Sequence, residues 1–184
     1  MQIDDAIKSR KSARKFSHEK PDWRDIIECV DLMRFAPMAG GDFSLKFILV
    51  SDREKIQKIA EACQQDFVAK AHYVLAVCSK PDRTINAYGK RGEIFARQQA
   101  GAAMQNFLLK IEEKKLATCW IGHFVESQIK HILEIKDGVN VEAIFPIGYD
   151  FEKIKPSKKI NLDNVLYFEK YGKKKMGKDN AINV

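Results

Sequence analysis

Two arginines and a serine near the N-terminus are the first side chains whose types and spacing could bind a ligand. Arg10, Ser12 and Arg14 alternate along the chain, and in an extended backbone residues two apart point to the same side. Two guanidinium groups and a hydroxyl on one side suit a phosphate, through charge-assisted and bidentate hydrogen bonds. A second basic group, Lys155, Lys158 and Lys159, lies near the other end of the chain and could meet this group in space. A basic face exposed to solvent is the alternative interpretation.

The sequence offers no self-sufficient catalytic apparatus beside this group. The chain has four scattered histidines, His18, His72, His123 and His131. They form no HExxH motif and no paired ligand spacing, so no metal site is expected. No GxxxxGKS/T loop is present, and no GxGxxG motif follows an expected strand, which argues against the common nucleotide-binding loops.

The length and composition predict one compact domain. The chain has 184 residues, of which 45% are apolar and 31% charged, as in ordinary globular domains. Its four cysteines, at positions 29, 63, 78 and 119, share no CxxC spacing, so we expect reduced core thiols. No signal-peptide-like segment and no run of about 20 apolar residues occurs. We therefore expect a cytoplasmic protein with no membrane partner.

The basic excess permits anionic partners without requiring them. Lysine and arginine number 32 against 25 aspartates and glutamates, a net charge of +7, and the isoelectric point is near 9.2. Part of the excess lies in residues 170–184, which we interpret as a basic C-terminal tail after a domain spanning residues 1–169. Because no helix-turn-helix, RRM-type or zinc-finger motif accompanies the basic clusters, no nucleic-acid partner is expected.

Hydrophobic periodicity predicts alternating helices and short strands, which indicates an α/β or α+β fold. Asp22 and Asp52 are each expected to cap the helix that follows. We expect helices over residues 22–35, 53–63, 93–115 and 125–133, and strands over 45–50, 72–78, 118–121 and 141–149.

Three details of this pattern carry further expectations. The polar residues 81–92 indicate a loop or a broken helical excursion beside a substrate entrance. Pro146 indicates that the last strand lies at an edge of the sheet or contains a bulge. In the long helix, one face collects small and apolar residues that we expect to pack closely, and it includes Ile94, Gln98, Gly101, Gln105 and Leu109.

Four segments, in order, resemble motifs of the nitroreductase family of FMN-dependent oxidoreductases. They are RKSARKF (10–16), FAPMAGGDFSLKFILV (35–50), AGAAMQNFLL (100–109) and ATCWIGHF (117–124), and FPIGYD (145–150) follows at the expected distance. Each motif is degenerate, but their order and spacing make the match specific. The resemblance implies an α+β fold, in which helices flank a central antiparallel sheet and a homodimer exchanges C-terminal segments.

The resemblance also implies an FMN site at the subunit interface. Arg10 and Ser12 would bind the phosphate and ribityl chain, Arg14 would lie near flavin N1 and O2, and backbone N–H groups at Gly122 and His123 would face N5 and O4. The segment around Pro37 would reach FMN from the partner subunit. The predicted cofactor-binding residues are Arg10, Lys11, Ser12, Arg14, Pro37, Met38, Ala39, Gly41, Ile121, Gly122, His123, Lys158 and Lys159.

No catalytic side chain is expected, because the flavin carries the chemistry. The resemblance implies ping-pong transfer of hydride from NADH or NADPH, through flavin N5, to a small electron-poor acceptor such as a quinone or a nitroaromatic. A non-catalytic FMN-binding or cofactor-handling protein is the alternative. Several positions depart from the family pattern: Met38 replaces a serine, Gly41 an asparagine and His123 a glycine, while Phe43-Ser44-Leu45 replaces Gln-Pro-Trp.

Overall fold

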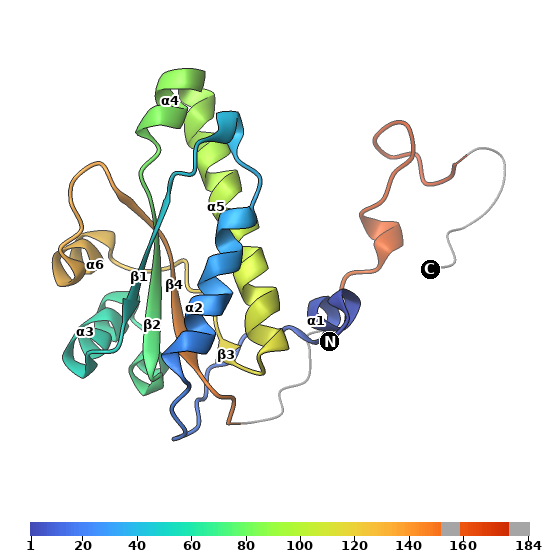
Figure 1. The fold of residues 1–184 in the computed structure, drawn as a ribbon. Helices are drawn as coiled ribbons and strands as arrows, with labels where there is room; N and C mark the ends of the chain where they lie inside the picture. Colours follow the sequence, from blue (N-terminus) through green and yellow to red (C-terminus); the bar gives the residue numbers. More distant parts are fainter. Residues whose placement is uncertain (152–158, 177–184) are drawn as a thin grey trace.

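A four-stranded antiparallel sheet forms the centre of the chain in the computed structural model (Figure 1). The structure describes residues 1–151 and 159–176. The strands run in the order β1-β2-β4-β3, and all three pairings are antiparallel. Their bounds are Leu45–Val50 for β1, Tyr73–Ser79 for β2, Ala117–Thr118 for β3 and Asn140–Gly148 for β4.

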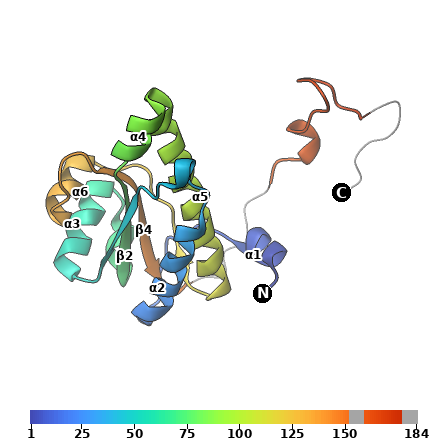
Figure 2. The same ribbon diagram turned by 45° about the horizontal axis from the view of Figure 1, so that its top comes forward.

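Helices cover both faces of the sheet (Figures 1 and 2). Helices α2 (Trp23–Asp31) and α5 (Lys90–Glu113) cover one face, and α3 (Arg53–Cys63) and α6 (Glu126–Leu133) cover the other. The shorter helices are α1 (Ile3–Ser9) and α4 (Asp82–Tyr88), with 3-10 turns at Leu32–Phe35, Ala39–Gly41, Asp66–Lys70 and Leu162–Asn164. This arrangement confirms the expected α+β fold with an antiparallel sheet between helices.

The alternation of side chains along β2 divides the apolar core into two layers. Leu75 and Val77 pack toward α2 and α5 with Phe107 and Phe145. The residues between them in the strand, Val74 and Ala76, pack toward α3 and α6 instead. Both faces are therefore buried, so the strand reads as a continuous apolar run.

The two predicted helix caps are confirmed. Asp22 accepts a hydrogen bond from the backbone N–H of Arg24 at 2.9 Å, and Asp52 accepts one from that of Lys55 at 2.8 Å. Each carboxylate satisfies an N–H group that lacks a partner within the helix. All four cysteines are free and buried, as expected.

Residues 81–92 form a broken helical excursion, which is the second of the two expected alternatives, and not a loop. Helix α4 spans Asp82–Tyr88, and α5 begins at Lys90, directly after Gly89. The two helices pack so closely that a Cβ atom on Gly92 would lie 2.3 Å from the backbone oxygen of Thr84. The polar composition reflects exposed helix surface, and the glycine permits this contact between helices.

The buried face of α5 also differs from the predicted one. The core contains Ala96, Gln99, Ala100, Ala103 and Phe107, among others. Residues on the predicted face, such as Ile94, Gln98 and Gln105, are exposed, and Gly101 is half-buried. Apolar and small residues occupy both faces, so periodicity did not identify the face that meets the sheet.

Pro146 does not mark an edge strand, because β4 lies between β2 and β3. A register shift does occur in β4, near Val141 and Ala143, which pair with consecutive residues of β2. The backbone of Ile144 bonds that of Ile121, so Pro146, two residues on, faces the same neighbour. Between Thr118 and Ile121, the segment that follows β3 is not paired with β4. The N–H that proline lacks is therefore not needed for a hydrogen bond between these segments. The predicted strand 118–121 is accordingly reduced to β3 and one bridge.

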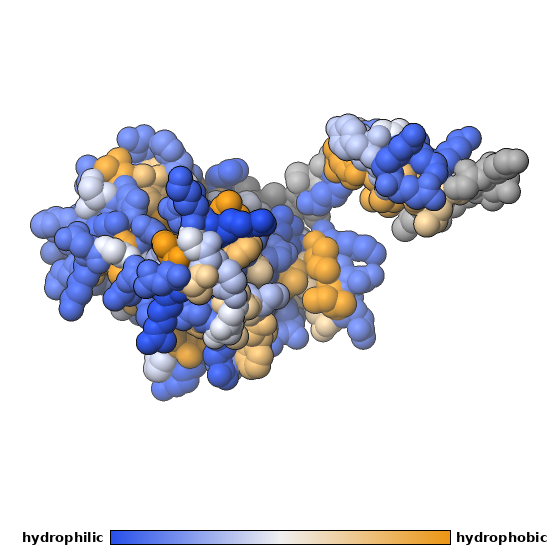
Figure 3. All heavy atoms as spheres, turned by 90° about the horizontal axis from the view of Figure 1, so that it is seen from above, coloured by the Kyte–Doolittle hydropathy of each residue, from blue (hydrophilic) through white to orange (hydrophobic). Residues whose placement is uncertain are grey.

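Residues 159–176 lie apart from the sheet and its helices, beyond α1 (Figures 1 and 2). Within this segment the rings of Tyr167 and Tyr171 lie 4.7 Å apart, and the ammonium of Lys174 lies 4.1 Å from the centre of the Tyr167 ring. Apolar side chains gather on α1 and on this segment (Figure 3). Among the described residues, no helix combines the length and apolar character that crossing a membrane requires.

Candidate functional site

Residues 10–14 run beside the segment that follows α5. Helix α1 ends at Ser9, and the next residue, Arg10, has a backbone φ of −51° and ψ of 129° that start an extended stretch. The N–H of Ala13 donates to the carbonyl of Thr118 at 2.9 Å, and Ala13 itself is buried. This bond fixes the position of the stretch, so that the residues on either side of Ala13 are held against residues 117–119.

Three of the predicted ligand-binding residues influence the pKa of the Cys119 thiol. Burial raises the pKa of this thiol, while the positive charges of Arg14 and Arg10 and hydrogen bonds from Ser12 and Arg14 oppose the rise. Arg10, Ser12 and Arg14 therefore act on one point, as the alternation of their side chains predicted. In the part of the chain that the structure describes, no carboxylate pairs with Arg10 or Arg14.

Lys11 lies on the other side of the stretch. Its ammonium forms an ion pair with Asp150 at 2.6 Å, next to the bridge between Asp150 and Phe16. The ring of Phe16 covers Gly148, where a Cβ atom would lie 2.9 Å from the ring. Lys11 therefore connects the N-terminal stretch to the end of β4, and its contribution to a cofactor site stays a prediction.

Residues 121–123 form an open edge beside the sheet. Ile121 is buried, and its backbone exchanges two hydrogen bonds of 3.0 Å with Ile144. Gly122 and His123 are exposed, and a Cβ atom on Gly122 would meet nothing within 4 Å. Trp120 is 40% exposed, and its ring centre lies 5.7 Å from that of Phe145. Gly122 and His123 of the predicted flavin edge are thus open to solvent, and Trp120 packs beside Phe145.

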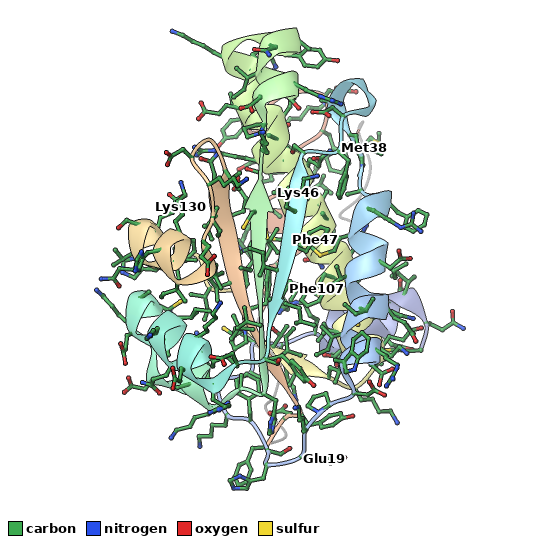
Figure 4. All side chains as sticks on the ribbon, turned by 60° about the vertical axis from the view of Figure 1, so that its left-hand side comes forward. Glu19, Met38, Lys46, Phe47, Phe107 and Lys130 are labelled. Carbon is green, nitrogen blue, oxygen red and sulfur yellow. The ribbon has the colours of Figure 1, made fainter. Side chains whose placement is uncertain are left out.

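The third predicted group, Pro37, Met38, Ala39 and Gly41, lies elsewhere. Met38 is near one end of the sheet, while Glu19, which follows the N-terminal stretch, is at the other (Figure 4). Gly40, with φ of 61°, packs against Tyr88 of α4, and a Cβ atom there would lie 2.9 Å from the tyrosine oxygen. A single chain therefore brings Arg10, Ser12 and Arg14 near residues 117–119 but does not bring residues 37–41 to them.

A buried hydrogen-bond network that the sequence did not predict holds residues 42–44, which directly follow this group. Gln99 accepts bonds from the N–H and the hydroxyl of Ser44 at 3.0 and 2.8 Å, and donates to the carbonyl of Asp42 at 3.0 Å. The hydroxyl of Thr84 donates to the Asp42 carboxylate at 3.0 Å. We call these four residues the Gln99 clamp. A glutamine among the small apolar residues of the long helix was the one sequence signal for it.

The remaining predicted residues lie at the C-terminal side. Lys159 is exposed at the start of the segment that stands apart from the sheet. Lys155 and Lys158 lie outside the described residues. Within residues 1–151 and 159–176, no cluster of histidine, cysteine and carboxylate side chains could hold a metal ion.

Comparison with known proteins identifies the family. The model of the nitroreductase family matches residues 7–149. A relative from Archaeoglobus fulgidus, provisionally named an NADH dehydrogenase/NAD(P)H nitroreductase, is 26% identical over 148 residues, covering 78% of this chain and 82% of the relative. The chain therefore belongs to the nitroreductase family, and the resemblance drawn from its motifs is confirmed.

Solved structures agree with this assignment. A nitroreductase family protein from Clostridium novyi NT has a TM-score of 0.76 at 26% identity, covering 94% of this chain and 96% of that one. The NADPH:FMN oxidoreductase from Vibrio harveyi, solved with NAD+, has a TM-score of 0.82 at 18% identity, covering 92% and 77%. The second likeness concerns the fold alone. The protein is thus an α+β member of this family with a small antiparallel sheet.

Proposed function

We propose that the protein is an FMN-dependent oxidoreductase that passes hydride from NADH or NADPH to a small electron-poor acceptor, of the quinone or nitroaromatic type, in a ping-pong sequence. The observation that carries the proposal is the hydrogen bond from Ala13 to Thr118, which places Arg10, Ser12 and Arg14 beside residues 117–119 in a member of the nitroreductase family. The names of an NAD(P)H nitroreductase and an NADPH:FMN oxidoreductase among its relatives support the choice of cofactor and donor.

The residues fit FMN in charge and in space. The guanidinium group of Arg10, which has no carboxylate partner in the described chain, and the hydroxyl of Ser12 suit a phosphate dianion and the ribityl chain. The open space beside Gly122 would admit a flat ring system close to the backbone. Lys158 and Lys159 would add positive charge from the C-terminal side. Lys11 would contribute through its position, since its ammonium already pairs with Asp150.

Each group would have a distinct task at the flavin. Bound FMN supplies the hydride chemistry, accepting at N5 and gaining negative charge near N1. Arg14 would stabilise that charge, because a fixed guanidinium in a partly desolvated site interacts strongly with it. The N–H groups of Gly122 and His123 would donate toward N5 and O4, with Ile121 anchoring the turn to β4.

The site is proposed to be completed by a second copy of the chain. Pro37, Met38, Ala39 and Gly41 would contribute to the partner's flavin pocket through main-chain groups, since none has a polar side chain. An exposed apolar surface supports a homodimer: a hollow of about 360 Å³, lined by residues that include Ile3, Phe35 and Leu109, lies between α1 and α5. The C-terminal segment that stands apart from the sheet would wrap around the partner.

Titration of FMN against protein, followed by flavin fluorescence, tests the site directly. We expect one FMN per chain and at least about tenfold weaker binding for Arg10→Gln, because a charge-assisted hydrogen bond is lost. Lys8→Gln on α1 removes an equal charge from an exposed side chain and serves as the matched control. Equal weakening by both variants would show that net charge, and not this site, governs binding.

A further inference from the structure

A second cationic site lies at the end of the sheet where β2 begins. Six residues with basic side chains, Arg14, Lys15, His18, Arg53, Lys70 and His72, line a cavity of about 560 Å³, which we call the basic hollow. They come from the stretch after residue 13, the start of α3, the 3-10 turn before β2, and the residue just ahead of β2. No element of the proposed flavin edge, residues 121–123, lines it.

The basic hollow has no carboxylate among the described residues that line it, and Arg14, Arg53 and Lys70 have no carboxylate partner within the described chain. This lining contains four permanent cations and two imidazoles. Of the carboxylates adjacent in sequence to its lining residues, Asp52 caps α3, and Asp150 forms an ion pair with Lys11 at 2.6 Å. Like charges gathered in a cavity repel one another, so the arrangement favours an anion that neutralises them.

Arg53 is held in place for such an anion. Its two terminal nitrogens donate to the carbonyls of Ala71 and Ala69, both at 2.7 Å. Neither bond neutralises the guanidinium, and three of its five N–H groups stay available. Across the hollow, Nε2 of His72 lies 3.2 Å from the carbonyl of Ser17. The site therefore has a fixed cation and a tethered imidazole before any ligand arrives.

Lys70, His18 and two aromatic rings complete the lining. Lys70 and His18 are exposed, and no carboxylate of the described chain forms an ion pair with Lys70. Phe16 is half-buried, while Phe151 is exposed at the rim. The volume of about 560 Å³ exceeds what a bare phosphate fills, and an exposed ring could stack against a base.

We propose that the basic hollow binds a phosphate monoester or inorganic phosphate, held by Arg53, Lys70 and His18. This site is separate from the one proposed for the phosphate of FMN at Arg10 and Ser12, and the inference goes beyond the proposed oxidoreductase activity. Arg14 borders both sites. A ligand in the hollow therefore lies near the residue proposed to stabilise the reduced flavin.

Calorimetric titration with two probes, inorganic phosphate and adenosine 2′-monophosphate, tests the proposal on the protein loaded with FMN. We expect the dissociation constant to rise about tenfold in Lys70→Gln and again in His18→Asn, since each removes a charge-assisted hydrogen bond. Both residues are exposed, so neither variant should impair folding. Lys58→Gln and His131→Asn, which lie in a different hollow between α3 and α6, are matched controls and should leave binding unchanged.

The two probes distinguish the source of the phosphate. Similar affinity for both would identify a simple phosphate site, and at least about tenfold tighter binding of the nucleotide would identify a nucleotide site with ring stacking. The proposal is overturned if neither probe binds at millimolar concentration, or if the control variants weaken binding as much as Lys70→Gln does. Repeating the titration on Arg10→Gln separates the two sites: lost FMN with retained phosphate binding is expected, whereas lost phosphate binding would place the probe in the flavin site.

Discussion

The two ends of the sheet are built on opposite principles. At one end, the Gln99 clamp holds residues 42–44 through four buried or partly buried hydrogen bonds. At the other, Arg10, Arg14, Arg53 and Lys70 have no carboxylate partner within the described residues. A loop whose polar groups form hydrogen bonds within the protein is rigid without a ligand. Cations that have no counter-charge favour the binding of an anionic ligand. The first end supplies shape to the proposed site, and the second supplies charge.

The largest effect is expected from breaking the clamp. Gln99→Leu leaves the N–H and hydroxyl of Ser44 and the carbonyl of Asp42 without their partner. Since each buried unsatisfied group costs about 1–3 kcal/mol, we expect a loss of about 3 kcal/mol in the free energy of unfolding, measured with urea. The adjacent Gln98 is exposed, so Gln98→Leu should change this quantity by under about 0.5 kcal/mol. Similar losses in both variants would mean that the clamp does not stabilise the fold.

A smaller loss is expected where α4 meets α5. Gly92→Ala places a methyl group 2.3 Å from the carbonyl oxygen of Thr84, and neither backbone can move without separating the helices. We expect about 2 kcal/mol of destabilisation, as for other overpacked sites. Because Thr84 also bonds Asp42, the variant should loosen the clamp, seen as faster amide hydrogen exchange at Ser44. Unchanged exchange at Ser44 would show that the helix contact and the loop are independent.

At the charged end of the sheet, we expect a substitution to weaken ligand binding while leaving the free energy of unfolding nearly unchanged. Arg14 is exposed, so Arg14→Ala should alter the free energy of unfolding of the flavin-free protein by less than about 0.5 kcal/mol. The same change should weaken FMN binding about tenfold and shift the flavin midpoint potential to a more negative value, because negative charge at N1 loses its counter-charge. Arg14→Lys should restore part of both. A variant that unfolds readily yet keeps its potential would contradict this contrast.

The smallest effect is expected from the pH dependence of stability at Cys63, a buried core residue of α3. Burial raises the pKa of the Cys63 thiol to about 12, from an ordinary value of 9.0. The unfolded thiol ionises first as pH rises, so the stability contributed by the neutral buried thiol is fully present below pH 9 and declines toward pH 12. Urea unfolding between pH 8 and pH 10.5 should therefore show a steeper decline for the wild type than for Cys63→Ala. Identical slopes would indicate that this thiol is accessible to solvent.

Local signals predicted much of the fold. Asp22 and Asp52 cap their helices because capping depends only on neighbouring residues. The prediction for the buried face of α5 was wrong, and the prediction for residues 81–92 left a loop and a broken helix open, because both depend on contacts across the chain. The role of Gly92, for example, is apparent only from its contact with Thr84. Gln99 bonds Ser44 from 55 positions away.

In the candidate site, too, features that depend on neighbouring residues were predicted, and features that depend on distant segments were not. Alternation along an extended stretch predicted that Arg10, Ser12 and Arg14 share one side, and all three influence the pKa of Cys119. Their role at a cofactor stays a prediction. The engagement of Lys11 by Asp150 could not be predicted, since it requires β4 to end beside the stretch. The basic hollow could not be predicted, because its residues come from four segments and no single segment indicates an anion site by itself.

The most direct test of the central claim is a visible absorption spectrum of the freshly purified protein, followed by anaerobic addition of NADH and then NADPH. We expect a yellow protein with one FMN per chain that bleaches with at least one nicotinamide and regains colour when a quinone is added. A colourless protein that takes up no added FMN would contradict the proposed cofactor site. Bound FMN that neither nicotinamide reduces would contradict the proposed activity and favour the non-catalytic alternative.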